Sequence, residues 1–412
     1  MNRVKPITLQ AVIRVSLIVV ICAYSLRTGF SFGETRVDLI GKIPLLIALA
    51  SILLIFTYRL KAYKGPGDIA ACIFAALLTY QIYRSSHNAD GMLYYVLMMS
   101  NLIVYVFASR YINIASLGRI NIHIYIFGVL FYTLLMTVYL TQVALAGGAI
   151  LDNPALWDPE TIKLYEVQFG EIIAFQGLTG DPNFVGPATA IFLFIGLYSN
   201  FGKYKILSYY GNSIFFMAIF FSNSRGALLA VFLSMGVSFI INSKSATKSN
   251  NSLLSLVSIF TAALVIASFL GAGASNPFAK LEKGADRRLL EWGTVLEASA
   301  SNPLLGMGLG FNKETIGKQA ENGFITLIAE TGLLGLFAFA MIPFITIRRF
   351  VKNESASRNL SEMRPWIAYV IYLIIAMMYT SVEASPSLWI ALAIIASYST
   401  FKQPNNRLIQ AQ

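Results

Sequence analysis

Apolar runs long enough to cross a lipid bilayer recur along the whole chain. A helix that crosses ~30 Å of hydrocarbon needs about 20 apolar residues, and the sequence holds about twelve such runs. Only 12% of the residues are charged, against about 25% in a typical soluble domain. The runs lie near residues 8–26, 40–58, 68–83, 91–109, 121–146, 183–200, 206–222, 226–242, 252–271, 323–347, 365–383 and 387–401. The sequence therefore predicts an all-α integral membrane protein, with a single polytopic domain over residues 1–412.

The basic residues fall in alternate connections between these runs. Cytoplasmic loops carry an excess of Lys and Arg, so this pattern predicts that both termini lie in the cytoplasm. The net charge of +11 is then a consequence of topology. Because the charge is dispersed over short loops, nucleic-acid binding is not expected. The basic residues on the cytoplasmic side are Arg3, Lys5, Arg59, Lys61, Lys64, Arg110, Arg119, Lys203, Lys205, Lys244, Lys248, Arg348, Arg349, Lys352, Arg358, Arg364, Lys402 and Arg407.

Two segments on the outer side are too long to be simple turns. They span residues 147–182 and 271–322, and loops beyond about 12–15 residues usually have a function or are disordered. In the second segment, Leu289, Trp292 and Leu296 follow helical spacing and form one apolar face. We expect a helix at the outer interface, with Trp292 at the level of the lipid headgroups.

Arg225 lies in a polar interruption, Ser224-Arg225-Gly226, between two apolar runs on the outer side. A guanidinium offers permanently charged, bidentate donors that suit a phosphate. Arg287 and Arg288 also lie outside, and with Arg225 they would hold a pyrophosphate. Adjacent helical residues point about 100° apart, so we expect only one of this pair to face the site. The alternative is that these arginines contact lipid headgroups.

Two further groups of polar residues start apolar runs on the outer side. Asp181 and Asn183 begin the run at 183–200, where they either cap the helix or bind a sugar hydroxyl. Glu321 and Asn322 begin the run at 323–347, where a carboxylate either caps the helix or takes a proton from an attacking hydroxyl. Trp292 is also a candidate to stack on a sugar ring.

Glu330 lies deeper in the same apolar run, where a charge is costly and usually functional. We expect it to be a buried partner of an arginine in a substrate site. No metal site is expected, because Cys22, Cys72, His87 and His123 lack metal-ligand spacing. No other cofactor is predicted.

Four stretches in this order resemble the O-antigen ligase and O-antigen polymerase superfamily of bacterial inner-membrane proteins. The resemblance covers roughly residues 177–345. The matching stretches are Gly180–Asn183, Ser224–Ala230, Arg288–Trp292 with Asn302–Gly308, and Asn322–Gly335.

The resemblance implies a GT-C-like glycosyltransferase that works at the periplasmic face without a metal. Its donor would be an oligosaccharide linked to undecaprenyl diphosphate, and Arg225 and Arg288 would bind the pyrophosphate leaving group. Membrane lipids and a chain-length regulator protein are the other partners it suggests.

One departure favours the polymerase branch over the ligases. In ligases of this superfamily a histidine precedes the asparagine of the Asn322–Gly335 stretch, and here that position is Glu321. We therefore expect a polymerase that joins repeat units, with an O-antigen ligase as the alternative. A flippase or transporter of lipid-linked oligosaccharides is a second alternative, although it would need polar residues in both halves of the chain. A scaffolding membrane protein is a third, and it leaves the outer Arg and Glu residues unexplained.

Overall fold

The computed structural model describes most of the chain between residues 65 and 401 and a short hairpin before it. The described residues are 29–32, 35–38, 65, 67–85, 89–111, 117–146, 175, 182–199, 201–202, 205–222, 224–242, 277–317, 320–354, 360–383 and 385–401. Backbone alone is described for some helical residues, including Arg225 and Arg287.

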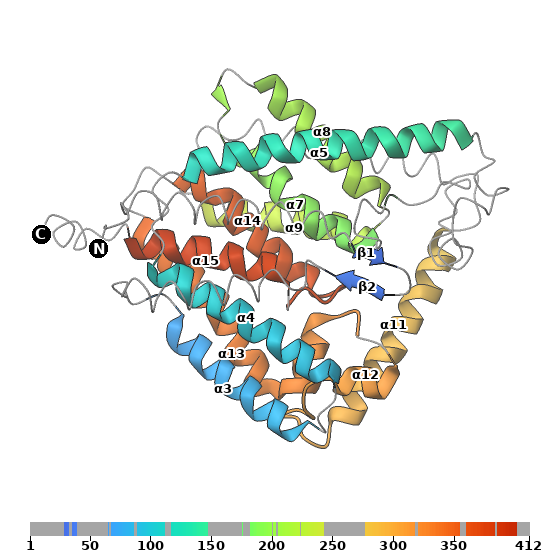
Figure 1. Ribbon diagram of the computed structural model, residues 1–412, viewed down its shortest axis with the longest axis vertical. Helices are drawn as coiled ribbons and strands as arrows, with labels where there is room; N and C mark the ends of the chain where they lie inside the picture. Colours follow the sequence, from blue (N-terminus) through green and yellow to red (C-terminus); the bar gives the residue numbers. More distant parts are fainter. Residues whose placement is uncertain are drawn as a thin grey trace, which may run out of the picture.

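Nine predicted apolar runs coincide with helices of the described residues (Figure 1). The runs predicted at 8–26, 40–58 and 252–271 lie outside the described residues. The nine helices are α3 (Asp68–Arg84), α4 (Ala89–Tyr111), α5 (Leu117–Ala146), α7 (Pro182–Tyr198), α8 (Lys205–Phe221), α9 (Arg225–Asn242), α13 (Gly323–Glu354), α14 (Leu360–Ala376) and α15 (Pro386–Phe401).

Three helical stretches are long and apolar enough to cross a membrane: Asp90–Arg110, Leu117–Thr141 and Gly323–Val351. The shorter apolar helices are Asn183–Tyr198, Gly226–Ser238 and Pro386–Tyr398. These helices are of the membrane type, and the count of about twelve spans stays a prediction.

The prediction of an all-α chain needs one correction. Strands β1 (Gly29–Phe32) and β2 (Thr35–Asp38) form an antiparallel hairpin in which Phe32 lies opposite Thr35. Only two residues separate the strands, the connection length typical of a tight hairpin turn. The remaining described elements are helical.

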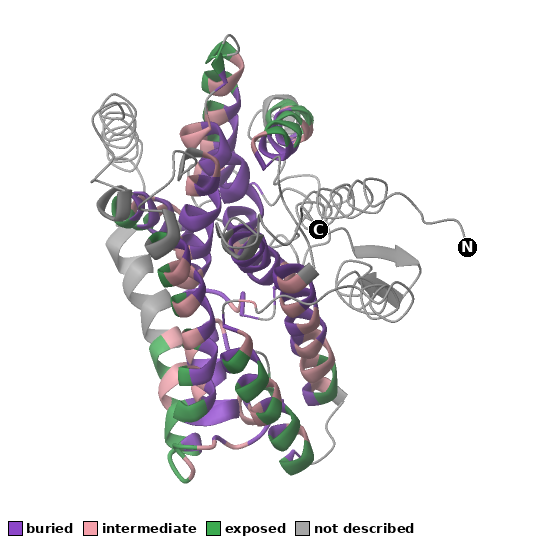
Figure 2. Cartoon of the chain, turned by 90° about the vertical axis from the view of Figure 1, so that its left-hand side faces the viewer, coloured by how far each residue is buried: buried purple, intermediate pink, exposed green. Residues whose placement is uncertain are grey.

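Helix α15 lies in the interior of the bundle, between two groups of helices. It packs against α4, α13 and α14, while α14 packs against α7 and α9 and α13 packs against α3. Trp389 on α15 is fully buried among aromatic rings, with Phe339 at 5.8 Å and Tyr105 at 6.4 Å between ring centroids. Figure 2 shows buried residues along the inner helices and exposed residues on the outer ones.

Two ion pairs mark opposite ends of the bundle. Asp68 at the start of α3 lies 3.0 Å from Arg110 at the end of α4. At the other end Asp90, near the start of α4, lies 2.8 Å from Lys313. Lys313 belongs to α12 (Phe311–Ile316), which follows α11 (Pro277–Ser299). Both helices fall within the segment at 271–322 that is predicted to lie outside.

Helix α13 is broken near one third of its length. Gly332 has φ 72° and ψ −176°, which is not helical, and such a backbone conformation is accessible to glycine but not to other residues. Within a membrane, a break of this kind is tolerated where protein satisfies the freed backbone groups. Hydropathy alone predicts one continuous run over residues 323–347.

Candidate functional site

Arg288 and Glu321, two of the residues predicted to be catalytic, contact each other directly. Arg288 Nη2 lies 2.6 Å from Glu321 Oε2, and the two side chains are 31% and 36% exposed. Exposed ion pairs typically contribute only about 0.2–1 kcal/mol. A competing anion therefore has to displace only a weak ion pair to bind the Arg288 guanidinium.

The packing of α11 against the bundle directs the Arg288 side chain toward Glu321. Val295 is fully buried, and with Trp292 it packs against Ile325 and Ala329 of α13. Arg288 lies one turn before Trp292 on the same face. Leu289 and Leu296 are 59% and 39% exposed, so these two leucines face away from the bundle, and the position of this face at the outer interface stays a prediction. Trp292 packs against α13, and its buried indole Nε1 has no hydrogen-bond partner among the described residues.

Asn322 caps α13 and leaves Glu321 outside the helix. Its Oδ1 accepts hydrogen bonds from the backbone N–H groups of Phe324 at 3.0 Å and Ile325 at 3.2 Å. An N-cap asparagine satisfies backbone donors of the first turn in this way. Of the two readings of this pair, capping therefore applies to Asn322, and the Glu321 carboxylate is bound to Arg288 instead.

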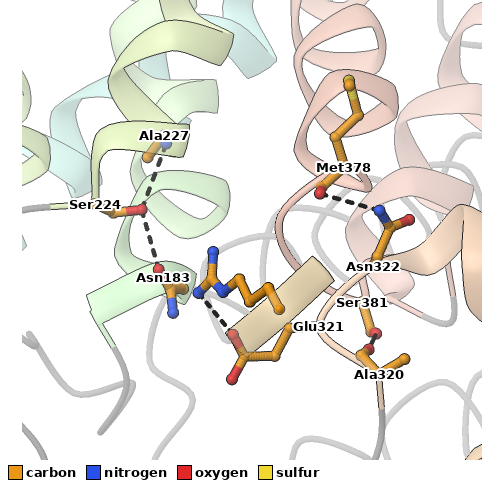
Figure 3. A network of polar contacts seen from close by, with 9 residues as sticks. Asn183, Ser224, Ala227, Ala320, Glu321, Asn322, Met378 and Ser381 are labelled. Carbon is orange, nitrogen blue, oxygen red and sulfur yellow. Dashed lines mark hydrogen bonds and ion pairs between the residues drawn. The ribbon is translucent and has the colours of Figure 1, made fainter. Parts of the chain in front are cut away.

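The loop between α14 and α15, residues 377–385, holds this helix start in place. Gly323 N donates to Met377 O at 2.8 Å, Asn322 Nδ2 donates to Met378 O at 3.2 Å, and Ser381 Oγ donates to Ala320 O at 2.6 Å. Figure 3 shows the contacts of Asn322 with Met378 and of Ser381 with Ala320 on one side of Glu321, with Asn183 and Ser224 on the other. Hydropathy places residues 377–383 inside an apolar run and does not predict this role.

The same loop reaches the start of α9, where the Ser224-Arg225-Gly226 turn lies. A Cβ added at Gly226 would lie 2.5 Å from Cγ of Tyr379. The tyrosine ring therefore packs here because residue 226 has no side chain. Ser224 Oγ accepts a hydrogen bond from Ala227 N at 3.4 Å and donates to Asn183 Oδ1 at 3.3 Å. Ser224 thus caps α9, and Asn183 links the starts of α7 and α9.

Two carboxylates are buried behind this surface. Glu330 and Glu383 are each 1% exposed, and a Cβ at Gly323 would lie 2.3 Å from Glu383 Oε2. Tyr94 Oη donates to Glu383 Oε1 at 3.4 Å. Glu330 interacts with the backbone N–H groups of Gly310 and Asn312, and among the described side chains no arginine forms an ion pair with it. The described residues therefore do not supply the arginine that was expected to pair with Glu330.

Three predicted site residues cannot be placed at the level of side chains. Asp181 lies outside the described residues, as do the side chains of Arg225 and Arg287. The backbone of Arg225 forms the first residue of α9, next to the contact between Gly226 and Tyr379. Across the described part of the chain, no group of three or more His, Cys, Asp or Glu side chains is arranged to hold a metal ion.

A known protein family matches the segment of the chain that contains most of these residues. Residues 211–340 match the O-antigen ligase family model (Wzy_C). The match confirms the resemblance to the O-antigen ligase and polymerase superfamily. No curated protein matches the chain.

The O-antigen ligase match extends from α8 into α13 and includes Arg225, Arg288 and Glu321. Asn183 and the loop at 377–385 lie outside it. The match and the apolar helices together support a membrane protein of lipopolysaccharide biosynthesis, with a ligase- or polymerase-type transferase activity.

Proposed function

We propose that this protein is a polysaccharide polymerase of the bacterial inner membrane. It transfers a growing glycan from undecaprenyl diphosphate onto a lipid-linked repeat unit at the periplasmic face. The contact between Arg288 and Glu321 carries the proposal, because it pairs an anion-binding guanidinium with a carboxylate at the start of α13. These are the two groups that such a transfer needs.

The reaction forms one glycosidic bond and breaks one bond to phosphate. A hydroxyl of the acceptor sugar attacks the anomeric carbon of the donor glycan, and the bond from that carbon to the diphosphate oxygen breaks. The electron pair leaves with undecaprenyl diphosphate, whose negative charge Arg288 and Arg225 stabilise. The proton of the attacking hydroxyl passes to the Glu321 carboxylate, which acts as general base. No metal takes part in this proposal.

The ion pair suggests how the two groups are used in turn. Without substrate, the Glu321 carboxylate forms an ion pair with the Arg288 guanidinium. A diphosphate offers more negative charge and more oxygen acceptors than one carboxylate, so it competes for the guanidinium. Binding of the donor then releases Glu321 toward the acceptor hydroxyl. Because the pair is partly exposed, this exchange needs little free energy.

A ligase that transfers the glycan to the lipid A core is the second candidate, and the description of the matching family favours it. Glu321 favours the polymerase, because the resemblance implies a histidine at this position in ligases. In a flippase, polar residues would line both halves of the chain, whereas the contacts described above gather at one end of α9, α11 and α13.

Deletion of the gene that encodes this protein distinguishes a polymerase from a ligase or a flippase. A polymerase mutant should attach a single repeat unit to the lipid A core, because ligation and flipping remain intact. A mutant whose lipid A core carries no repeat unit at all would overturn the polymerase proposal in favour of a ligase or flippase. Complementation with the wild-type gene should restore long chains.

A further inference from the structure

A connector after α11, residues 302–308, fills the break in α13. Met307 N donates to Ala329 O at 2.8 Å, and Gly308 N donates to Glu330 O at 3.1 Å. On the far side of the break, Leu333 N donates to Pro303 O at 2.9 Å, and Leu334 N donates to Leu304 O at 3.1 Å. The connector therefore satisfies backbone groups that the break leaves without helical partners.

The fit between the connector and the break leaves no room for side chains. Gly306 and Gly332 have φ of 71° and 72°. A Cβ at Gly306 would lie 2.5 Å from Gly332 N, and a Cβ at Gly332 would lie 2.2 Å from Leu304 O. The connector is thus fixed to α13 at one position along the helix.

The end of α3 holds the connector from a second side. Gln81 Nε2 donates to Leu305 O, and Arg84 Nη1 donates to Gly306 O at 3.1 Å. With the Asn302 amide turned so that its oxygen faces the guanidinium, Oδ1 accepts from Nη1 and Nη2 of Arg84 at 3.2 and 2.9 Å. Gln81 is fully buried, and the Arg84 guanidinium lies 5.7 Å from the centroid of the Tyr80 ring.

These contacts act on α11 through its C-terminal end. Asn302 N donates to Ser299 O at 3.1 Å, which ties the connector to the last turn of α11. Arg288 lies about 16 Å farther along that helix at 1.5 Å per residue. A small tilt at Ser299 therefore moves Arg288 by a larger distance relative to Glu321. Among the described side chains, the apolar contact between α11 and α13 consists of the buried residues Val295, Ile325 and Ala329, with Trp292 partly buried against them.

We propose that Gln81 and Arg84 are positioning residues that hold α11, and with it Arg288, at the correct distance from Glu321. The expected effect on polymer formation rests on the proposed function, whereas the expected effect on the position of α11 does not. Helix α3 lies outside the matched residues 211–340. It also packs against α13 independently of the connector, for example through Phe74 and Phe339 at 5.7 Å between ring centroids. Removal of the two polar side chains should therefore loosen the connector, which keeps its backbone hydrogen bonds to α13, without detaching α3.

The first test measures polymer formation by the full chain in membranes. Gln81→Ala with Arg84→Ala should reduce long-chain product on the order of tenfold to a hundredfold at equal protein level, since a misplacement of about 1 Å can cost 10²-fold in rate. Arg84→Lys keeps one donor for Gly306 O and should retain an intermediate level. Tyr83→Ala is the matched control, because Tyr83 is 83% exposed beside Arg84. Wild-type product from the double variant would show that polymer formation does not depend on these two side chains, and the second test then decides whether they position α11.

The second test is independent of catalysis. In purified protein with Cys22 and Cys72 replaced by serine, spin labels at positions 290 and 337 report the distance between α11 and α13, since Leu290 and Phe337 are 72% and 65% exposed. The double variant should broaden or shift the distance distribution while the midpoint of thermal unfolding stays near that of the Tyr83→Ala control. An unchanged distribution would overturn the positioning role even if product is lost. A changed distribution with wild-type product would support the positioning of α11 and count against the use of Arg288 in the reaction.

Discussion

The ring of Tyr379 lies against Gly226, so the loop between α14 and α15 contacts the turn that holds Arg225. A Cβ at Gly226 would lie 2.5 Å from Tyr379 Cγ. Because the same loop also binds Ala320, Asn322 and Gly323, it connects the start of α9 with the start of α13.

Gly226→Ala should therefore destabilise the protein by about 1–3 kcal/mol, the typical effect of overpacking. Gly236→Ala is a control in the same helix, because no atom lies within 4 Å of a Cβ added there. Alanine should leave stability unchanged or raise it slightly at that position. Thermal unfolding in detergent compares the two variants, and equal unfolding midpoints would contradict the contact.

Changes of Arg288 and Glu321, made one at a time, should each abolish polymer formation, but for different chemical reasons. Arg288→Lys keeps the charge but loses the planar fork, so we expect loss of long-chain product. Glu321→Gln keeps the shape but removes the base, and a positioned base contributes typically 10²–10⁴-fold. Lipid-linked repeat units should accumulate in both variants, as measured by extraction and chromatography of the lipid-linked saccharides. Full activity of Glu321→Gln would leave this residue only the role of a partner for Arg288.

The break in α13 should be more sensitive to alanine than Gly317, a glycine with the same φ but with ψ of −2° in place of −176°. Gly332 and Gly317 both have φ of 72°, but a Cβ at Gly317 meets no atom within 4 Å, whereas one at Gly332 would lie 2.2 Å from Leu304 O. Gly317→Ala should cost about 1–2 kcal/mol from backbone strain. Gly332→Ala should reduce stability and expression much further. Similar losses in the two variants would show that the connector moves aside without difficulty.

The predicted topology places the two ends of the bundle on opposite sides of the membrane. Cysteines introduced at Lys313 and Lys352, in a background without Cys22 and Cys72, should differ in their reaction with an impermeant thiol reagent added outside. We expect labelling at 313 and protection at 352. Equal labelling at both positions would contradict the model of about twelve spans with both termini inside.

A chelator tests the absence of a metal from the proposed reaction. Treatment of membranes with EDTA should leave the rate of polymer formation unchanged, because the guanidinium groups supply the positive charge that faces the diphosphate. Loss of activity that Mg²⁺ or Mn²⁺ restores would mean that a cation takes part in charge stabilisation.

Hydropathy and short motifs predicted the helices well because a bilayer imposes a length and a composition on each span. The pairing of Arg288 with Glu321 was not predicted as a contact, although both residues were selected. Thirty-three positions separate them in the sequence (321 − 288), and their contact depends on which face of α11 packs against α13. Leu289 and Leu296 carried the apolar signal, but in a membrane protein apolar side chains also face lipid.

The loop at 377–385 was missed for a related reason. Its residues extend an apolar run, so hydropathy placed them within a span that in the structure ends at Ala376. The polar residues Thr380, Ser381 and Glu383 were the available signal. Likewise, Gly332 within the run at 323–347 indicated the break in α13, but a single glycine in a helix is ordinarily tolerated.

The position of this loop also decides how the protein can be recombined with its relatives. Residues 211–340 carry the recognisable family segment, yet the backbone groups that fix Asn322 and Gly323 come from Met377 and Met378. A chimera that exchanges only the family segment would combine Asn322 and Gly323 of one parent with the loop of the other. An exchange that runs from 211 to 385 keeps both parts from one parent, and we expect that boundary to yield active hybrids.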